Sequence, residues 1–91
     1  MVSVYIPSPL RRLTGGQTHI TAAARSVRDL LDELDRAFPG MRAELRDETG
    51  EVRSFINTFV NGTEIRQLRG LDTPLAETDE VSIIPAMAGG H

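Results

Sequence analysis

The sequence predicts an α+β domain in which a mixed sheet of four to five strands carries one main helix on one face. Two observations support this prediction. Residues 26–38 repeat apolar side chains at helical spacing, and the segments on either side are short apolar runs of the kind that form strands. The chain has 91 residues, which is enough for one hydrophobic core and too few for two.

Two strands are predicted before the helix. Residues 2–6 alternate apolar and polar side chains, which is typical of a half-buried strand, and Pro7 and Pro9 end it. Residues 17–21 are rich in β-branched side chains and form the partner strand of a hairpin. The glycine pair at residues 15–16 marks a turn in the long loop between the two strands.

The helix is the clearest element. Charged side chains occupy the side opposite its apolar stripe and should face solvent. Ser26 can cap the first turn, with Asp29 three residues later as in a capping box. Pro39 and Gly40 end the helix, and residues 41–45 can add one further turn. The apolar stripe consists of Val27, Leu30, Leu31, Leu34 and Phe38.

Three segments after the helix complete the predicted sheet. Residues 55–60 form a strand that the turn at Asn61 and Gly62 closes, residues 64–67 add a short edge strand, and residues 80–85 form the last strand. The helix then covers one face of the sheet, and the first and last strands lie side by side in its centre. This order of elements is the β-grasp architecture, a two-layer arrangement suited to so small a chain.

The composition argues against several classes of function. The net charge of −3 disfavours nucleic acid as a partner. No apolar run can span a bilayer and the N-terminus lacks the features of a secretory signal, so we expect a cytoplasmic protein that binds no membrane. The chain has no cysteine, and neither His19 nor His91 has a second ligand-type residue at metal-binding spacing. We therefore expect no metal site, no bound cofactor and no ordinary catalytic site.

The C-terminus carries the strongest functional signal. We expect residues 1–85 to form the domain and residues 86–91 a flexible tail that includes Gly89, Gly90 and His91. A glycine pair in a tail usually means only flexibility, but here it closely follows a central strand. Glycine has no Cβ, so a thin chain end can enter a narrow channel, and five extended residues would reach roughly 17 Å.

The chain resembles the MoaD/ThiS-type sulfur carriers, a ubiquitin-like family, and is most similar to the carriers of actinobacterial cysteine synthesis. The resemblance rests on the residues 14–17, 59–62 and 79–85 and on the glycine pair, and it covers essentially the whole chain. One departure is His91, because members of the family act with glycine as the last residue.

The resemblance implies a protein that carries sulfur and catalyses nothing itself. The carboxylate of Gly90, with Gly89 as its steric companion, would be activated with ATP by an E1-like adenylating enzyme and converted into a thiocarboxylate. A cysteine synthase-like enzyme would then accept the sulfur. His91 would first have to be removed, because it occupies the Gly90 carboxylate in a peptide bond. The resemblance implies a zinc metallopeptidase of the JAMM class for this step, unless His91 is the remnant of a purification tag.

Other functions stay open at this point. Sister pathways make molybdopterin, thiamin, thiolated tRNA or a secondary metabolite. A protein modifier would instead join Gly90 to lysines of other proteins, and a plain interaction domain would not use its glycine pair at all. All ten basic residues of this chain are arginine, so it cannot form lysine-linked chains on itself.

Side-chain alternation predicts which residues of the domain meet partners. In the strand at residues 80–85, Ile84 should lie on the open face of the sheet, away from the helix, and in the strand at residues 55–60 Phe59 should do the same. We expect these two side chains and Met87 of the tail to bind partner enzymes through an exposed apolar patch. Four arginines could also steer partners, although a solvated surface is the ordinary role for each of them. They are Arg11, Arg12, Arg66 and Arg69.

Overall fold

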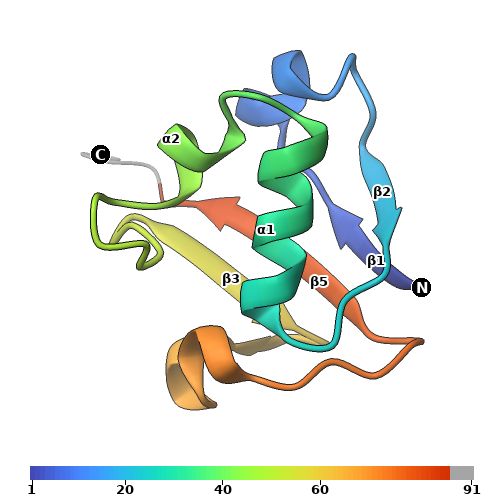
Figure 1. Ribbon diagram of the computed structural model, residues 1–91, viewed down its shortest axis with the longest axis vertical. Helices are drawn as coiled ribbons and strands as arrows, with labels where there is room; N and C mark the ends of the chain where they lie inside the picture. Colours follow the sequence, from blue (N-terminus) through green and yellow to red (C-terminus); the bar gives the residue numbers. More distant parts are fainter. Residues whose placement is uncertain (87–91) are drawn as a thin grey trace.

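The computed structural model describes residues 1–86 and contains one five-stranded mixed sheet with a main helix packed against it (Figure 1). This arrangement confirms the predicted β-grasp, or ubiquitin-like, fold class. None of the helices in residues 1–86 is long and apolar enough to cross a membrane. The elements are β1 (Val2–Tyr5), η1 (Ser8–Leu13), β2 (His19–Ala22), α1 (Val27–Ala37), α2 (Met41–Leu45), β3 (Ile56–Val60), β4 (Thr63–Glu64), η2 (Ile65–Gln67), η3 (Gly70–Asp72) and β5 (Glu80–Pro85), where η marks a 3₁₀ helix.

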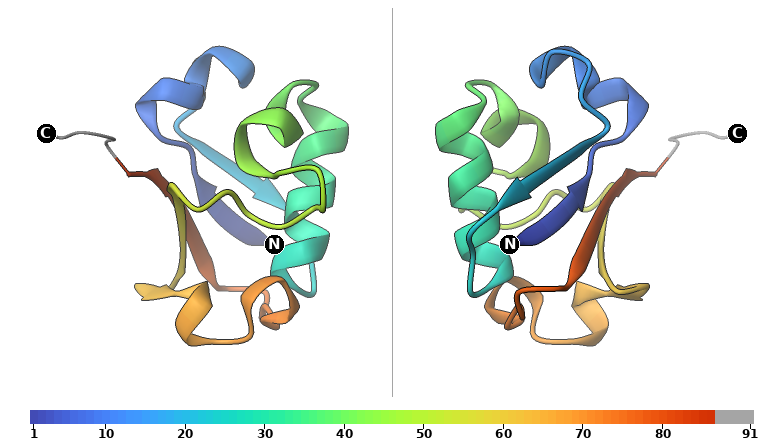
Figure 2. Two further views of the ribbon diagram at one scale, coloured as in Figure 1. Left: turned by 90° about the vertical axis from the view of Figure 1, so that its left-hand side faces the viewer. Right: turned by 90° about the vertical axis from the view of Figure 1, so that its right-hand side faces the viewer.

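The strands lie in the order β2-β1-β5-β3-β4. β1 and β5 lie side by side in the centre, as the sequence predicts. They are parallel, with Val4 opposite Val81. β3 runs antiparallel on the other side of β5, with Ile56 opposite Pro85. The C-terminal end of β5 therefore emerges between the end of β1 and the start of β3 (Figure 2).

Helix α1 covers one face of the sheet, and no helix covers the other face within the described residues (Figure 2). The predicted stripe is buried in the core, except for a half-buried Phe38 at its end. Ser26 caps the helix as predicted, because its Oγ accepts a 3.1 Å hydrogen bond from the Asp29 N–H. The Asp29 carboxylate in turn accepts from the Arg25 N–H over 3.4 Å, one residue earlier than a standard capping box requires.

The hairpin turns follow local chemistry. Asn61 and Gly62 have positive φ angles of 51° and 90°, and the strands β3 and β4 pair directly across them, which is the geometry of a two-residue hairpin. β2 begins at His19, later than predicted. Residues 14–17 before it form a turn. The Thr14 Oγ1 donates to the Gln17 carbonyl over 3.0 Å, and the Gln17 side-chain amide donates to the Thr14 carbonyl over 3.1 Å.

Two segments differ from the sequence-based prediction. The long loop after β1 contains η1, because Leu10 turns into the core and is only 3% exposed. The predicted edge strand at residues 64–67 is shorter and starts earlier: only Thr63–Glu64 pairs with β3. Ile65 leaves the edge to bury its side chain, and η2 begins there.

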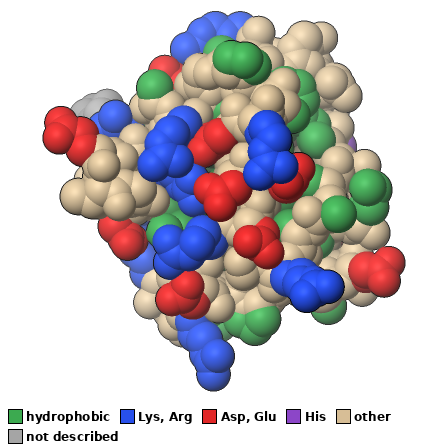
Figure 3. All heavy atoms as spheres, viewed as in Figure 1, with side chains coloured by type: hydrophobic (Ala, Val, Ile, Leu, Met, Phe, Trp, Pro, Cys, Tyr) green, Lys and Arg blue, Asp and Glu red, His purple; other side chains and the backbone are tan. Residues whose placement is uncertain are grey.

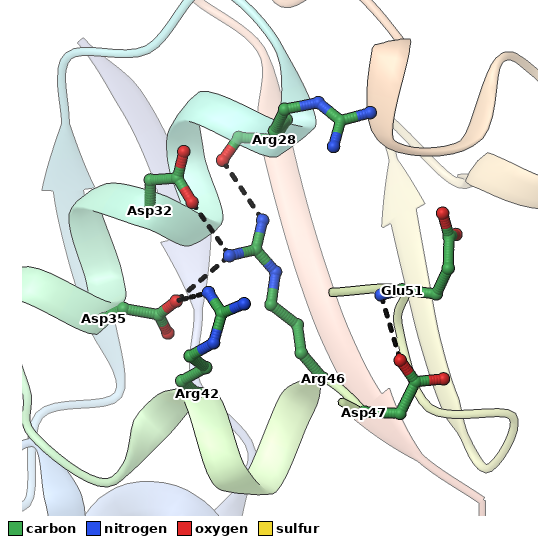
Figure 4. Close-up of polar contacts among 7 residues, drawn as sticks. All are labelled: Arg28, Asp32, Asp35, Arg42, Arg46, Asp47 and Glu51. Atoms are coloured by element: carbon green, nitrogen blue, oxygen red, sulfur yellow. Dashed lines mark hydrogen bonds and ion pairs between the residues drawn. The ribbon is translucent and has the colours of Figure 1, made fainter. Parts of the chain in front are cut away.

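A cluster of arginine and aspartate side chains links α1 to α2 and the residue after it (Figures 3 and 4). The Arg46 side chain is only 3% exposed, and its Nη1 donates to Asp32 over 2.8 Å and to Asp35 over 3.1 Å. Arg42 reaches Asp35 over 3.4 Å. Burial raises the pKa of Asp35, against the opposing pull of Arg46 and Arg42. The two aspartates, predicted to face solvent, thus anchor a buried arginine.

Candidate functional site

The last strand, β5, terminates at the end of the sheet where β3 begins, and the predicted tail follows it. Pro85 pairs with Ile56 at the end of β5. One residue further on, the Ala86 N–H donates a hydrogen bond to the Phe55 carbonyl oxygen over 2.6 Å. Main-chain pairing therefore holds the chain up to the first residue of the predicted tail.

Four of the predicted site residues lie outside the described residues. They are Met87, Gly89, Gly90 and His91. Their roles, and the proposed division of the chain after residue 85, therefore stay predictions.

The open face of the sheet carries the side chains that alternation places there. Val81 and Ile83 of β5 are buried beneath α1, whereas Ile84 is 39% exposed. Phe59 also points away from α1, because its two neighbours in β3 are buried. The predicted orientation of both strands is confirmed.

Phe59 is less exposed than the sequence predicts. The strand register places it between Ser82 of β5 and Glu64 of β4, and it is half-buried there. Ile84 lies opposite Asn57, so Phe59 and Ile84 are diagonal neighbours across β3 and β5. The more exposed apolar side chain of the predicted pair is thus Ile84, which is also the nearer to the tail.

Phe55 is an apolar residue at this site that sequence reasoning did not single out as partner-binding. It is 48% exposed and lies beside Ala86 through the hydrogen bond described above. A signal for it exists in the sequence. Because β3 and β5 are antiparallel neighbours, a phenylalanine just before β3 must lie near the point where the chain leaves β5.

A hollow of about 340 Å³ opens beside Phe55. Its lining combines apolar side chains with charged ones and includes Arg53, Arg66 and Asp47. Hydrogen bonds, chiefly from the Thr49 hydroxyl, hold the pKa of Asp47 below its usual range, so this group is ionised at neutral pH. The tail base, defined as Phe55, Ile84, Pro85 and Ala86, is therefore an apolar surface with charges at its margin.

The other side of the open face is polar and aromatic. Tyr5 and His19 are directly opposite each other in β1 and β2, and their rings meet edge to face at 5.5 Å. Within residues 1–86, no three histidine, cysteine, aspartate or glutamate side chains are grouped closely enough to hold a metal ion. The described part of the site is thus a surface beside residue 86, where the predicted tail begins.

Fold and site together define a ubiquitin-like β-grasp protein whose central strand runs into a C-terminal glycine pair. The chain belongs to the ThiS family, whose model matches residues 4–90. Within that family it resembles the CysO sulfur carriers.

Three relatives illustrate this similarity. The sulfur carrier protein CysO of Mycobacterium tuberculosis is 36% identical over 91 residues, with 98% of each chain covered. The CysO crystallised with BexX from Amycolatopsis orientalis is 34% identical and superimposes with a TM-score of 0.92, covering 99% of this chain and 100% of that one. The small archaeal modifier protein 1 from Methanosarcina acetivorans is 32% identical with a TM-score of 0.84, covering 98% of this chain and 95% of that one.

Proposed function

We propose that this protein is a non-enzymatic sulfur carrier whose Gly90 carboxylate is converted into a thiocarboxylate that supplies sulfur for cysteine biosynthesis. The observation that carries the proposal is the position of the glycine pair, closely after the central strand of a chain that is 36% identical to CysO over nearly its whole length. The cysteine pathway follows from that similarity.

The chemistry explains why such a chain needs no catalytic group of its own. A free carboxylate is a poor electrophile. Attack of the Gly90 carboxylate on the α-phosphorus of ATP forms an acyl-adenylate and releases pyrophosphate. A sulfur nucleophile then displaces AMP and leaves a thiocarboxylate. An E1-like adenylating enzyme supplies the catalysis for these steps, and a cysteine synthase-like enzyme consumes the product.

The body of the domain serves as the docking surface for these enzymes. In this proposal Ile84, Phe59 and Met87 contact the partners, and Phe55 joins them because of its exposure beside Ala86. An apolar centre that is desolvated on docking typically supplies most of the binding energy of such an interface. The tail then reaches from this surface into the partner's active site.

In this proposal, a chain that ends at His91 is a precursor. Hydrolysis of the peptide bond after Gly90 releases the carboxylate that adenylation needs, and a JAMM-type zinc metallopeptidase is a suitable catalyst for that step. A carrier that gains its reactive group only after cleavage can be regulated by that cleavage.

The proposal is tested with two proteins, one ending at His91 and one ending at Gly90. Each is incubated with the activating enzyme, ATP and a sulfur source in the absence of peptidase. We expect only the Gly90 form to gain about 16 mass units, the difference between sulfur and oxygen, by intact-mass analysis. No gain in the Gly90 form contradicts the carrier function, and an equally fast gain in the His91 form contradicts the precursor role.

A protein modifier is the second candidate function, and the similarity to a small archaeal modifier protein favours it. In that case Gly90 would form an isopeptide bond with lysines of other proteins. The absence of lysine from this chain leaves single conjugation open and excludes lysine-linked chains of the protein on itself. High-mass conjugates in native cells that disappear on deletion of Gly90 would support this function.

A further inference from the structure

Eight of the ten arginines of this protein fall into two groups that differ in their partners. On the side of the molecule that carries α1 and α2, positive and negative side chains are interspersed (Figure 3). There, five arginines form ion pairs. The pairs are Arg12–Glu44, Arg28–Asp72, Arg36–Glu33, Arg42–Asp35 and Arg46 with Asp32 and Asp35. The charges on that side are largely compensated within the protein itself.

A second group, Arg11, Arg53 and Arg66, is held mainly by neutral oxygens, and of the three only Arg66 also forms an ion pair within residues 1–86, over 3.6 Å with Glu64. We call these three the tail-base arginines. Within residues 1–86, Arg11 and Arg53 form no ion pair with any carboxylate. The charges of Arg11 and Arg53 are therefore held in place without an acid in contact with them.

Arg11 is oriented by the end of β1. Its Nε donates to the Ile6 carbonyl oxygen over 3.1 Å, and its Nη2 donates to the Tyr5 hydroxyl over 3.0 Å. Tyr5 lies on the open face of the sheet, opposite Ser82 of β5. Arg11 thus presents a positive charge on the β1 side of the open face, and the rest of its guanidinium N–H groups stay available.

Arg66 is oriented by the start of β3. Its Nη2 donates to the carbonyl oxygens of Arg53 and Ile56 over 3.0 and 3.1 Å, and its Nη1 donates to the Asn57 side chain over 3.3 Å. Arg53 is itself fixed by a 3.0 Å hydrogen bond from its Nε to the Ala43 carbonyl. Arg53 and Arg66 line the same hollow beside Phe55.

Two acids lie near this pair. Asp47 lines the same hollow, and its Oδ1 accepts three hydrogen bonds from its own loop, from the Thr49 N–H, the Thr49 hydroxyl and the Glu51 N–H. Glu64 approaches Arg66 only to 3.6 Å. The two arginines and the two acids balance in number, but Arg53 forms no ion pair within residues 1–86 and the Arg66 side chain is 42% exposed. Guanidinium N–H groups of both arginines therefore stay free for a partner.

The tail-base arginines stand on both sides of the strand that delivers the tail. β1 and β3 are the two neighbours of β5, so their axes are about 10 Å apart across it. Register places the end of β1, the start of β3 and the end of β5 at the same end of the sheet (Figure 2). Any enzyme that binds the tail in a channel must bring the residues around the mouth of that channel close to these arginines.

We infer that the tail-base arginines dock carboxylate side chains that rim the tail-entry channel of the activating enzyme. This inference rests on the proposed function. Guanidinium groups bind carboxylates with two N–H groups at once, and groups that are already held in position lose less entropy on binding. The partner that fits has an apolar centre for Ile84 and Phe55, with acidic side chains on both sides of it.

Because the net charge of the protein is negative, the salt dependence of binding can test this inference. At −3, the chain as a whole repels an acidic partner, so added salt would strengthen binding if only the overall charges mattered. Local contacts between the tail-base arginines and carboxylates predict the opposite, a binding that weakens as salt increases.

The test measures the affinity of the carrier ending at Gly90 for the activating enzyme of the same organism. Arg11→Gln, and Arg53→Gln combined with Arg66→Gln, should each weaken binding about tenfold or more. Arg36→Gln alone, and Arg28→Gln combined with Arg36→Gln, make the same changes of charge on the ion-paired side and should leave the affinity within about twofold. For the unmodified carrier, raising salt from about 50 to about 500 mM should weaken binding, and this weakening should be smaller in the tail-base variants.

Thermal melting of every variant separates lost contacts from lost folding. If Arg11→Gln does not fold, the Arg53 and Arg66 double variant and the salt series on the unmodified carrier decide. Binding that is unchanged in a folded tail-base variant, or that strengthens with salt in the unmodified carrier, overturns the inference. Both results leave the proposed function intact when the carrier still gains sulfur at Gly90, whereas failure to gain sulfur counts against the proposed function itself.

Discussion

The Ala86 N–H donates to the Phe55 carbonyl oxygen over 2.6 Å, and this is the last main-chain contact that the described part of the chain makes before the glycine pair. It fixes the direction in which the chain leaves β5 and places the exposed Phe55 ring beside that point. Main-chain pairing within residues 1–86 thus extends to the first residue of the predicted tail. In the proposed function, this contact would present the chain end to a partner at a defined place.

Deletion of Gly90 and His91 should leave the fold intact and abolish adenylation. The last core residue within residues 1–86 is Ile83, well before the deleted pair, so the melting temperature should stay within about 2 °C of the value for the unmodified protein. ATP–pyrophosphate exchange with the activating enzyme measures adenylation directly. The matched control removes only His91 and should be active. Exchange that persists without Gly90 contradicts its assignment as the acceptor.

Ile84→Asp should weaken binding to the activating enzyme on the order of a hundredfold with little loss of stability, because the side chain is exposed at the tail base. Leu68→Asp is the control. Leu68 is 44% exposed and belongs to the segment after β4, away from the tail base. Calorimetric titration and thermal melting of the two variants check both parts of the prediction. Equal affinities for the two variants would show that the open face at Ile84 is not the docking surface.

Phe59→Asp should behave differently from Ile84→Asp. Phe59 is half-buried between Ser82 and Glu64, and an aspartate there would face the Glu64 carboxylate directly across the hairpin. We expect a loss of about 1–3 kcal/mol in the free energy of unfolding in addition to any loss of binding. Urea titration measures it. A variant as stable as Ile84→Asp would mean that Phe59 contributes little to the fold.

The sequence predicted this fold well where local patterns decide the structure. The α1 stripe, the Asn61–Gly62 turn and the limits of β5 follow from periodicity and turn chemistry within a few residues. Predictions were weaker where burial of one side chain redirects the chain. Leu10 draws the first long loop into η1, and Ile65 shortens the edge strand.

The site could be predicted only in part, because partners distant in sequence define it. Alternation assigned Ile84 and Phe59 to the open face, but the half-burial of Phe59 depends on Ser82 and Glu64, which only the strand register brings to it. The contrast between ion-paired arginines and tail-base arginines also lies outside any local pattern. Arg66, for example, is held by carbonyls of residues 53 and 56, which belong to a different part of the chain.

The buried Arg46, which lies between α1 and α2, should interact strongly with Asp32. Arg46 and Asp32 form a pair in which the arginine side chain is 3% exposed and the acid 47% exposed. Arg36 and Glu33 form the control pair, with 73% and 43% exposure. Because the acids are matched in exposure, the two pairs differ mainly in the burial of the arginine.

Double-mutant cycles to alanine on both pairs, read by urea unfolding, test this expectation. The coupling energy should be about 1–2 kcal/mol for Arg46 with Asp32 and at most about 0.5 kcal/mol for Arg36 with Glu33. Arg46→Ala alone should cost about 3 kcal/mol, since it removes a buried partner from two aspartates. Equal coupling in the two cycles would contradict the idea that burial makes the Arg46 pair strong.

Stability at acid pH should depend on Asp79. Its carboxylate accepts hydrogen bonds from the Ala76 N–H over 2.8 Å and from the Asn61 side chain over 3.0 Å, so it ties the loop before β5 to the β3–β4 turn. These bonds, the Ala76 one first, hold the pKa of Asp79 below its usual range. In acid the unfolded chain therefore binds more protons at this position than the folded chain, and the free energy of unfolding rises with pH.

The contribution of Asp79 is fully present above the ordinary aspartate pKa of about 3.9 and is lost as the pH falls through the lowered pKa of the folded state. Asp79→Ala should therefore be less stable than the unmodified protein at pH 7, and the difference should shrink as the pH falls below about 4. Glu48→Ala is the control, because the exposed Glu48 side chain makes no hydrogen bond within residues 1–86 and its removal should change stability by at most about 0.5 kcal/mol. Urea unfolding of the three proteins across this pH range provides the measurement. A difference between Asp79→Ala and the unmodified protein that is the same at pH 7 and in strong acid would mean that the charged form of Asp79 does not stabilise the fold.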